Sequence, residues 1–275
     1  QITFFKVVYR RHTNFSMETI AQTFLGTLEF GNQVTCKISR NGDLIHKVYI
    51  QTELPEVNIT GDGKFRWLNW IGHILIKNVD IEIGGQQIDK HYSEWFHIWN
   101  ELTQESGKKE GYASMVGNIP ILTQTIIGES NSKSTSIPSI TLYIPLNFWF
   151  CRNPGLALPL IALQYHEVKL RFTYNEALSP ANVARGASAD IIPTYLLEVW
   201  VDYIYLDTPE RRNFAMNDHE YLIEQLQYKG MEDTLQLEAA NEVGNFLKLR
   251  YNHPVKEIIW CLQDPIATVS YTHLT

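Results

Sequence analysis

The class of fold is decided by the stretch Val168-Lys169-Leu170-Arg171-Phe172-Thr173-Tyr174. Apolar or aromatic side chains occupy every second position of this stretch, and charged or polar side chains stand between them. Such alternation places one face of a β-strand in a core and the other face outward. The same period recurs in residues 34–39, 79–83 and 140–146, so the sequence predicts several half-buried strands.

Turn-forming residues separate these strand-like runs. Asn41-Gly42-Asp43 divides two of them, and the Asn-Gly pair favours a tight hairpin. Gly84-Gly85 has the same role further along the chain. About eight strands can be counted before Thr208, at a short spacing that is typical of an antiparallel sandwich or barrel. The sequence therefore predicts an all-β fold with few helices.

One helix is predicted near residues 90–104, where apolar side chains recur with helical spacing. These side chains are Trp95, Ile98, Trp99 and Leu102. Asp89 precedes them and is predicted to be the N-cap. Because a stripe this rich in aromatic residues needs a partner surface, we expect it to be buried against the end of a sheet.

The character of the sequence changes near Thr208. Thr208-Pro209-Glu210 offers a cap, a proline at the first helical position and an acid in the first turn. A second short helix is predicted over residues 218–227. Strand-like runs then resume, at residues 234–237, 246–251 and 255–262. This order predicts one β-domain, a linker and the opening strands of another domain.

The composition excludes several classes of protein. The chain has 275 residues, a net charge of −7 and 44% hydrophobic residues, which is enough apolar material to bury a large core. Its mild acidity argues against binding nucleic acid through charge. No apolar run reaches the roughly 18 residues of a membrane-spanning helix. The 3 Cys are widely spaced, so neither a disulfide framework nor a zinc site is predicted.

No pattern of catalytic residues stands out. His91, Glu94 and His97 are the nearest cluster of metal-binding types, but they lack a metal-ligand spacing. Neither a Gly-x-Ser-x-Gly elbow nor a phosphate-binding loop is present. Arg152 follows Cys151 and would lower its pKa, yet the aromatic residues before it favour burial and an inert thiol. The residues thus favour an interaction or structural protein without metal or cofactor.

Five segments together carry a resemblance to a known family. The segments are ITFFKVVYRRHTNF at 2–15, IGGQ at 83–86 with EW at 94–95, PLNFWFCRNPGLALPLIAL at 145–163, DYIYLDTPERR at 202–212 and NHPVKEIIW at 252–260. In this order they resemble the double jelly-roll major capsid protein of the nucleocytoplasmic large DNA viruses. The family often has a third arginine after Arg212, where this chain has Asn213.

The resemblance implies an antiparallel β-sandwich of the viral jelly-roll type. Residues 1–207 would form the first jelly roll and residues 208–229 the interdomain linker. Residues 230–275 would form the incomplete start of a second jelly roll. Residues 269–275 resemble the translation of a sequencing adapter and are expected to be non-native, an ordinary strand being the alternative.

The resemblance also implies a function. The chain would be a structural subunit of an icosahedral capsid, forming pseudo-hexagonal homotrimeric capsomers of a large double-stranded DNA virus. It would not be an enzyme and would need no cofactor. Its partners would be further copies in the capsid lattice, minor capsid and penton proteins, and an internal viral membrane nearby. It would lie in the virion capsid, be assembled in the host cytoplasm and bind no nucleic acid directly.

Two other functions remain open from the residues. A divergent jelly-roll relative would act as a minor capsid protein or as a carbohydrate-binding protein, with exposed aromatic residues and loop carboxylates holding the sugar. A jelly-roll enzyme of the cupin type would need a metal, and the His-x-His pair of such enzymes is absent.

Seven residues are predicted to hold the structure or its interfaces. Phe148, Trp149 and Phe150 are expected to pack at a strand end or near a contact of the trimer. Arg211 and Arg212 are expected to tie the linker to a carboxylate of one jelly roll. Trp95 and Trp99 belong to the predicted helical stripe.

Overall fold

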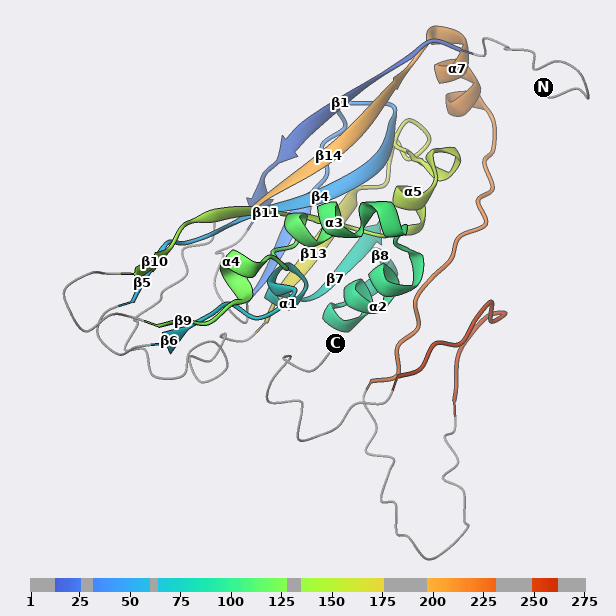
Figure 1. Cartoon of the computed structure of the whole chain (residues 1–275). Coiled ribbons are helices and arrows are strands. Elements are labelled where there is room, and N and C mark those ends of the chain that lie inside the picture. Colours follow the sequence, from blue (N-terminus) through green and yellow to red (C-terminus); the bar gives the residue numbers. More distant parts are fainter. Residues whose placement is uncertain are drawn as a thin grey trace, which may run out of the picture.

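A computed structural model describes residues 13–25, 32–59, 64–127, 135–175, 197–230 and 249–261. The described strands form two large antiparallel sheets and two small ones, accompanied by short helices (Figure 1). Residues 2–12 of the first resemblance segment, the run at 234–237 and residues 269–275 lie outside the described residues. None of the described helices is long and apolar enough to cross a membrane.

The first large sheet is built around β4, the longest of the described strands. Its order is β1-β14-β4-β11, and the two-residue strand β12 also pairs with β4. The bounds are β1 Phe15–Gln22, β14 Leu197–Leu206, β4 Leu44–Leu54, β11 Ile140–Pro145 and β12 Leu158–Pro159. All these pairings are antiparallel. In this sheet β1, the first described strand of the chain, lies next to β14, the last one.

The second large sheet contains the stretch that decides the fold class. Its order is β2-β3-β13-β7-β8, again with antiparallel pairing. The bounds are β2 Phe24–Leu25, β3 Gln33–Lys37, β13 Val168–Tyr174, β7 Ile76–Ile83 and β8 Gln86–Tyr92. Along β13 buried and half-buried side chains alternate without interruption, as the period of two predicts.

The order of the strands defines the sandwich as a jelly roll. Without the two-residue strands β2 and β12, each sheet has four strands. The first and last of these, β1 and β14, are neighbours, and so are the second and seventh, β3 and β13. Such pairing of early with late strands arises when Greek keys wrap into two packed sheets. The predicted all-β antiparallel sandwich is confirmed.

One core fills the space between the two sheets. Cys36, Leu170 and Ile81 stand opposite one another on β3, β13 and β7, and all three are buried. Ile50 and Val199 enter the same cluster from the other sheet. The buried faces of both sheets thus share one apolar interior, which stabilises the sandwich by removing that surface from water.

Two small two-stranded sheets extend the sandwich. The pairs β5 (Val57–Ile59) with β10 (Thr135–Ile137) and β6 (Lys64–Phe65) with β9 (Ile126–Ile127) lie together at one end (Figure 1). Gly84 and Gly85 connect β7 to β8 with φ of 61° and 85°. Positive φ at both positions is required by the tight hairpin turn that matches strand twist, so glycine is favoured there.

The described helices are short, as expected. They are α1 Ile71–Leu75, α2 Ser93–Thr103, η1 Ser106–Lys108, α3 Lys109–Met115, α4 Pro120–Thr123, α5 Trp149–Arg152, η2 Pro154–Leu156 and α7 Thr208–Met216. Within α7, Asp207 caps the N-terminus by accepting a hydrogen bond from the Thr208 amide, and Pro209 follows as predicted.

Two details of the helix predicted near residues 90–104 are wrong. It begins at Ser93, because the residues before it belong to β8, and Asp89 therefore lies in a strand instead of capping the helix. Its buried face consists of Ser93, Phe96 and Asn100. The predicted stripe is only half-buried at Trp95 and Trp99, and Leu102 is exposed.

The reason is that polar side chains point inward on α2. Ser93 donates a hydrogen bond to the carbonyl of His73 on α1, so its hydroxyl is satisfied inside the protein. Apolar periodicity assigns serine and asparagine to the outer face, and it therefore turns the helix toward the wrong side.

The helix predicted over residues 218–227 is also wrong. Residues 217–230 contain no helix, and the segment runs in extended form down one side of the molecule (Figure 1). Its polar groups bond to β8 of the sandwich instead of to each other. Likewise, the described residues 249–261 form no strand, because a strand requires a neighbour and no described strand lies beside them.

Candidate functional site

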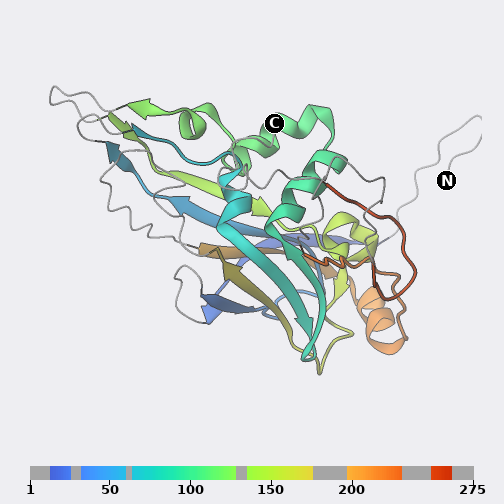
Figure 2. The ribbon, with the colours of Figure 1, turned by 90° about the horizontal axis from the view of Figure 1, so that it is seen from below.

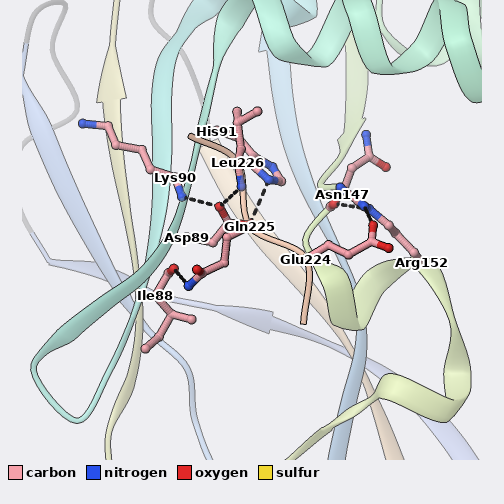
Figure 3. Close-up of polar contacts among 9 residues, drawn as sticks. All are labelled: Ile88, Asp89, Lys90, His91, Asn147, Arg152, Glu224, Gln225 and Leu226. Carbon is pink, nitrogen blue, oxygen red and sulfur yellow. Dashed lines mark hydrogen bonds and ion pairs between the residues drawn. The ribbon is translucent and has the colours of Figure 1, made fainter. Parts of the chain in front are cut away.

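The polar contacts between the linker and the sandwich gather at one corner, formed by β8, α2 and α5. Residues 224–226 of the linker pass along β8, the outermost strand of its sheet (Figure 3). Residues 249–261, drawn in red, lie on the same side of the molecule as α2 (Figure 2). At this site the linker is held against the sandwich.

Asp89 accepts a hydrogen bond from the backbone of the linker. Its Oδ1 accepts hydrogen bonds from the backbone amide of Leu226 at 3.0 Å and from the amide of Lys90 at 2.8 Å. Next to it, the Gln225 side chain donates to the carbonyl of Ile88 (Figure 3). A carboxylate that accepts backbone N–H groups makes stronger hydrogen bonds than a neutral acceptor does.

A buried histidine stands behind this carboxylate. His91 Nε2 lies 3.1 Å from Asp89 Oδ2, and the two side chains are 0% and 1% exposed. The His91 ring stacks on Phe148 with 4.5 Å between ring centroids. The carboxylate that accepts the linker amide thus lies next to a buried aromatic cluster, although no hydrogen bond joins its Oδ2 to the His91 ring.

Arg152 makes the second contact with the linker. Its Nη1 lies 2.9 Å from Glu224 Oε2, and its Nε donates to the Asn147 carbonyl at 2.9 Å. The guanidinium also lies 4.0 Å from the centroid of the Trp99 ring. Burial lowers the pKa of Arg152, whereas the charge of Glu224 opposes that shift. A partly desolvated cation of this kind favours an anionic partner.

Glu224 has a further cation on its other side. The ammonium of Lys256 forms an ion pair with Glu224 Oε1. The pKa of Glu224 is lowered, chiefly by the hydrogen bond from Lys256 and also by the charges of Lys256 and Arg152. One carboxylate therefore joins a residue before the linker to a residue beyond it.

A reciprocal pair of hydrogen bonds reinforces this connection. The side chain of Gln227 donates to the carbonyl of Asn252 at 2.8 Å and accepts from the amide of the same residue at 2.9 Å. Tyr228 packs on Tyr92 of β8, with 4.8 Å between ring centroids. Residues 224–228 thus contact both the sandwich and the segment 249–261.

The other end of the linker is anchored separately. Arg211 Nε lies 2.9 Å from Asp43 Oδ1, and Asp43 Oδ2 accepts from the Leu206 amide at 2.8 Å. Arg212 is exposed and forms no ion pair with any residue that the structure describes. The structure thus places the arginine–carboxylate contact of α7 on Arg211.

The predicted aromatic residues meet near the linker corner. Phe148, Trp149 and Phe150 follow β11 and are all buried inside the sandwich, packed against one another. Trp95 and Trp99 pack together with 5.4 Å between ring centroids, and Trp99 faces Arg152. A role of these five residues in a trimer contact stays a prediction.

The sequence did not predict the two carboxylates of this corner, namely Asp89, which accepts a hydrogen bond from the linker, and Glu224, which pairs with two cations. Asp89 was assigned to a helix cap and Glu224 to a helix that does not form. Arg152 was considered only for its effect on Cys151. No spacing rule links residue 89 to residue 226. The polar side chains of the linker were the one feature of the sequence that indicated polar contacts there.

Neither a metal-binding cluster nor a reactive thiol at Cys36 or Cys151 has support among the described residues. Among them no group of three or more His, Cys, Asp or Glu side chains could hold a metal ion. Burial raises the pKa of the Cys36 thiol and of the Cys151 thiol to about 12, so both stay protonated near neutral pH. What the corner does provide is a set of contacts that hold segments of chain together.

The fold and this corner define a jelly-roll protein of the viral type, with residues 224–228 docked on the sandwich. A family model described as the N-terminus of the major capsid protein matches residues 3–207, and one described as the large eukaryotic DNA virus major capsid protein matches residues 210–272. The chain belongs to the family of major capsid proteins of large DNA viruses, which confirms the resemblance seen in the sequence.

Individual relatives agree with this assignment. The major capsid protein of Pyramimonas orientalis virus is 54% identical over 260 residues, covering 94% of this chain and 59% of the relative. That of Phaeocystis pouchetii virus is 47% identical over 297 residues, covering 98% of this chain and 56% of the relative. The chain thus spans between half and three fifths of the length of these relatives.

A solved structure supports the fold. The subunit in a quasi-atomic model of the PBCV-1 virus capsid aligns with a TM-score of 0.66 and 42% identity, over 82% of this chain and 50% of that chain. The Faustovirus major capsid protein aligns with a TM-score of 0.57 at 11% identity, over 78% of this chain and 58% of that chain, which shows likeness of fold alone.

Proposed function

We propose that the chain is part of a structural subunit of the icosahedral capsid of a large double-stranded DNA virus. The observation that carries the proposal is the alignment with the PBCV-1 capsid subunit, at 42% identity over 82% of this chain. In this role the protein forms shell contacts and catalyses no reaction. It resides in the virion capsid after assembly in the host cytoplasm.

The proposed subunit has two jelly rolls side by side. Residues 1–207 form the first, residues 208–229 the linker, and residues 230–275 the start of the second. The end of β14 at Leu206, followed directly by the capped helix α7, supports a boundary there. Three subunits with two jelly rolls each give a trimer with six similar lobes, which is the basis of a pseudo-hexagonal capsomer.

A closed trimer sets requirements for the surface of the subunit. It needs head-to-tail contacts repeated around a threefold axis, because an identical patch cannot face itself in such a ring. Permanent interfaces typically bury about 2,000 Å² or more and are relatively apolar. The aromatic residues Phe148, Trp149 and Phe150 support such contacts from inside the sandwich, and Trp95 and Trp99 do so from α2.

Further partners follow from the same role. Trimers contact neighbouring trimers in the lattice, together with minor capsid and penton proteins, and lie close to an internal viral membrane. The negative net charge fits a shell that binds no nucleic acid directly.

The proposal is tested by the mass of the assembled protein. The complete reading frame that contains this sequence is expressed, and its product is measured by native mass spectrometry and viewed by electron microscopy. We expect three copies in one particle with a pseudo-hexagonal outline. A product that stays monomeric at micromolar concentration and binds sugars on a glycan array would contradict the proposal in favour of a carbohydrate-binding relative.

A further inference from the structure

Glu224 occupies a special position in the linker, because cations from both sides of the linker in sequence converge on it. Arg152 belongs to α5 of the sandwich, and Lys256 belongs to the segment beyond the linker. Each cation contacts a different oxygen of the same carboxylate. A single side chain thus connects three parts of the chain.

The sandwich presents Arg152 in a fixed orientation. Its Nε is held by the Asn147 carbonyl, and its guanidinium lies over the Trp99 ring. Its side chain is 22% exposed, against 45% for that of Glu224. Because the arginine is already oriented and partly desolvated, less side-chain freedom is lost when the carboxylate binds than in a pair of mobile surface groups.

The residues that follow Glu224 divide their contacts between two sides. Gln225 and Leu226 bond to Ile88 and Asp89 of β8, whereas Gln227 bonds to Asn252. The linker therefore sits between the sandwich and residues 249–261, with polar contacts to each.

The position of the linker also explains how the edge of the second large sheet is covered. β8 is an edge strand of its sheet, so among the described residues one side of it has no strand neighbour. Uncovered edges invite pairing with other chains, and native proteins often cover them with a loop. Here the linker lies along that edge, held by one side chain that donates to β8 and one that accepts from the linker.

We propose that residues 224–227 form a latch that fixes the segment 249–261 against the first jelly roll, with Glu224 as its positioning residue. The inference rests on the proposed function in one respect, namely that residues 249–261 belong to the second jelly roll. The latch sets the relative placement of the two jelly rolls within a subunit. A shell subunit needs this placement to be constant, since both jelly rolls contribute to one capsomer.

The test measures the distance between the two parts that the latch connects. Cys261 is exposed, whereas Cys36 is buried and Cys151 is half-buried. With Cys151 replaced by alanine in all variants, a spin label attaches to Cys261. A second label is introduced by Ser106→Cys at an exposed position after α2. Double electron–electron resonance on the 275-residue chain then gives the distribution of distances between the labels.

The variant Glu224→Gln keeps the shape of the side chain and removes its charge. We expect it to broaden the distance distribution while the circular dichroism of the sandwich stays unchanged. Amide hydrogen exchange in residues 225–228 should accelerate by roughly threefold to tenfold, the range expected for losing a partly exposed ion-pair network. The matched control is Glu220→Gln, because Glu220 is exposed on the same linker and forms no ion pair with the described residues.

A distance distribution and exchange rates in Glu224→Gln equal to those of the parent chain would overturn the latch. Equal broadening in Glu220→Gln would overturn it as well, since the effect would then not depend on the contacts of Glu224. Neither outcome bears on the mass of the capsomer. Conversely, a monomeric mass would contradict the proposed function without changing these distances.

Discussion

The sandwich and the linker are held in place by different forces. In the sandwich, side chains from both sheets share one apolar core, and the strands are joined by long hydrogen-bond ladders. The linker corner depends mainly on a few polar groups, chiefly Asp89, Arg152 and Glu224. Two smaller apolar contacts assist them, namely Ile223 against the core and Tyr228 on Tyr92. We therefore expect the large core to tolerate the loss of one polar contact, and the linker to be loosened by the loss of one carboxylate.

The strongest test of the sandwich side removes an aromatic ring from its centre. Phe172 on β13 is fully buried and packs edge-to-face on Phe24, with 5.8 Å between ring centroids. Phe172→Ala should lower the free energy of unfolding by about 3–5 kcal/mol, because it leaves a cavity between the sheets. Denaturant unfolding of the 275-residue chain measures this.

The control for this change is Tyr165→Ala, since Tyr165 is almost fully exposed. Its effect should stay within about 0.5 kcal/mol. A loss of less than about 1 kcal/mol for Phe172→Ala would show that the shared core does not carry the stability of the sandwich.

The stability of the fold at low pH is expected to depend on the buried side chain of His73. Burial lowers the pKa of His73 to about 3, and the nearby His97 adds to the shift. Around its ring lie Trp70, stacked at 5.5 Å, and Tyr112, whose hydroxyl is 2.9 Å from Nε2. Glu101, on the same helix as His97, raises the pKa of His97 against the larger lowering by burial.

The sign of the effect follows from the direction of this shift. An imidazole in the unfolded chain titrates near 6.5, so below that pH the unfolded chain binds a proton that the folded chain does not. Stability should therefore fall as the pH drops from about 6.5 toward 3, by about 1.4 kcal/mol per pH unit for this group. His73→Gln should flatten the slope, whereas exposed His166→Gln should keep it. The measurement is the free energy of unfolding from denaturant curves between pH 7.5 and 5. If its slope against pH were unaltered in His73→Gln, the assignment of this pH dependence to His73 would be contradicted.

The linker side is tested by removing the acceptor of its backbone. Asp89→Ala takes away the bonds to the Leu226 and Lys90 amides and leaves buried His91 without its neighbour. We expect a loss of about 1–3 kcal/mol in stability, together with faster exchange of the Leu226 amide. The matched change Asp218→Ala alters an exposed linker carboxylate and should do neither. An unchanged Leu226 amide in Asp89→Ala would show that this carboxylate does not hold the linker.

The smallest effect is expected at α7. Arg211→Ala removes an ion pair in which the arginine is exposed and the carboxylate of Asp43 is buried. Because Asp43 keeps the hydrogen bond from the Leu206 amide, the loss in stability should be about 1 kcal/mol. Arg212→Ala should have no measurable effect, since the structure places that side chain in solvent. Thermal unfolding of the two variants side by side checks this, and a larger loss for Arg212→Ala would reverse the assignment.

The sequence predicts the sandwich well because one force dominates it. The alternation in residues 168–174 and 79–83 reflects burial on one face of a strand, and both segments became strands of the same sheet. Gly84-Gly85 gave the hairpin between β7 and β8 for the same local reason. The capsid family was recognisable from segments that span most of the chain.

The linker could not be predicted in the same way. Residues 218–227 have local helical character, yet their polar groups find partners on β8, and these distant contacts outweigh the local preference. Asp89 was expected to cap a helix because a carboxylate before a helical pattern usually does so. Its actual role depends on a residue more than a hundred positions away, which no local pattern contains.

The most direct test of the comparison is native-state hydrogen exchange of the 275-residue chain in increasing denaturant. The account predicts two regimes. Amides of β4, β7, β13 and β14 should exchange only through global unfolding, with a strong dependence on denaturant, whereas the Leu226 amide should exchange through a local opening with little dependence. If the Leu226 amide followed the same denaturant dependence as β13, the linker would be an integral part of the cooperative sandwich, and the claim that it is latched on by separate polar contacts would be contradicted.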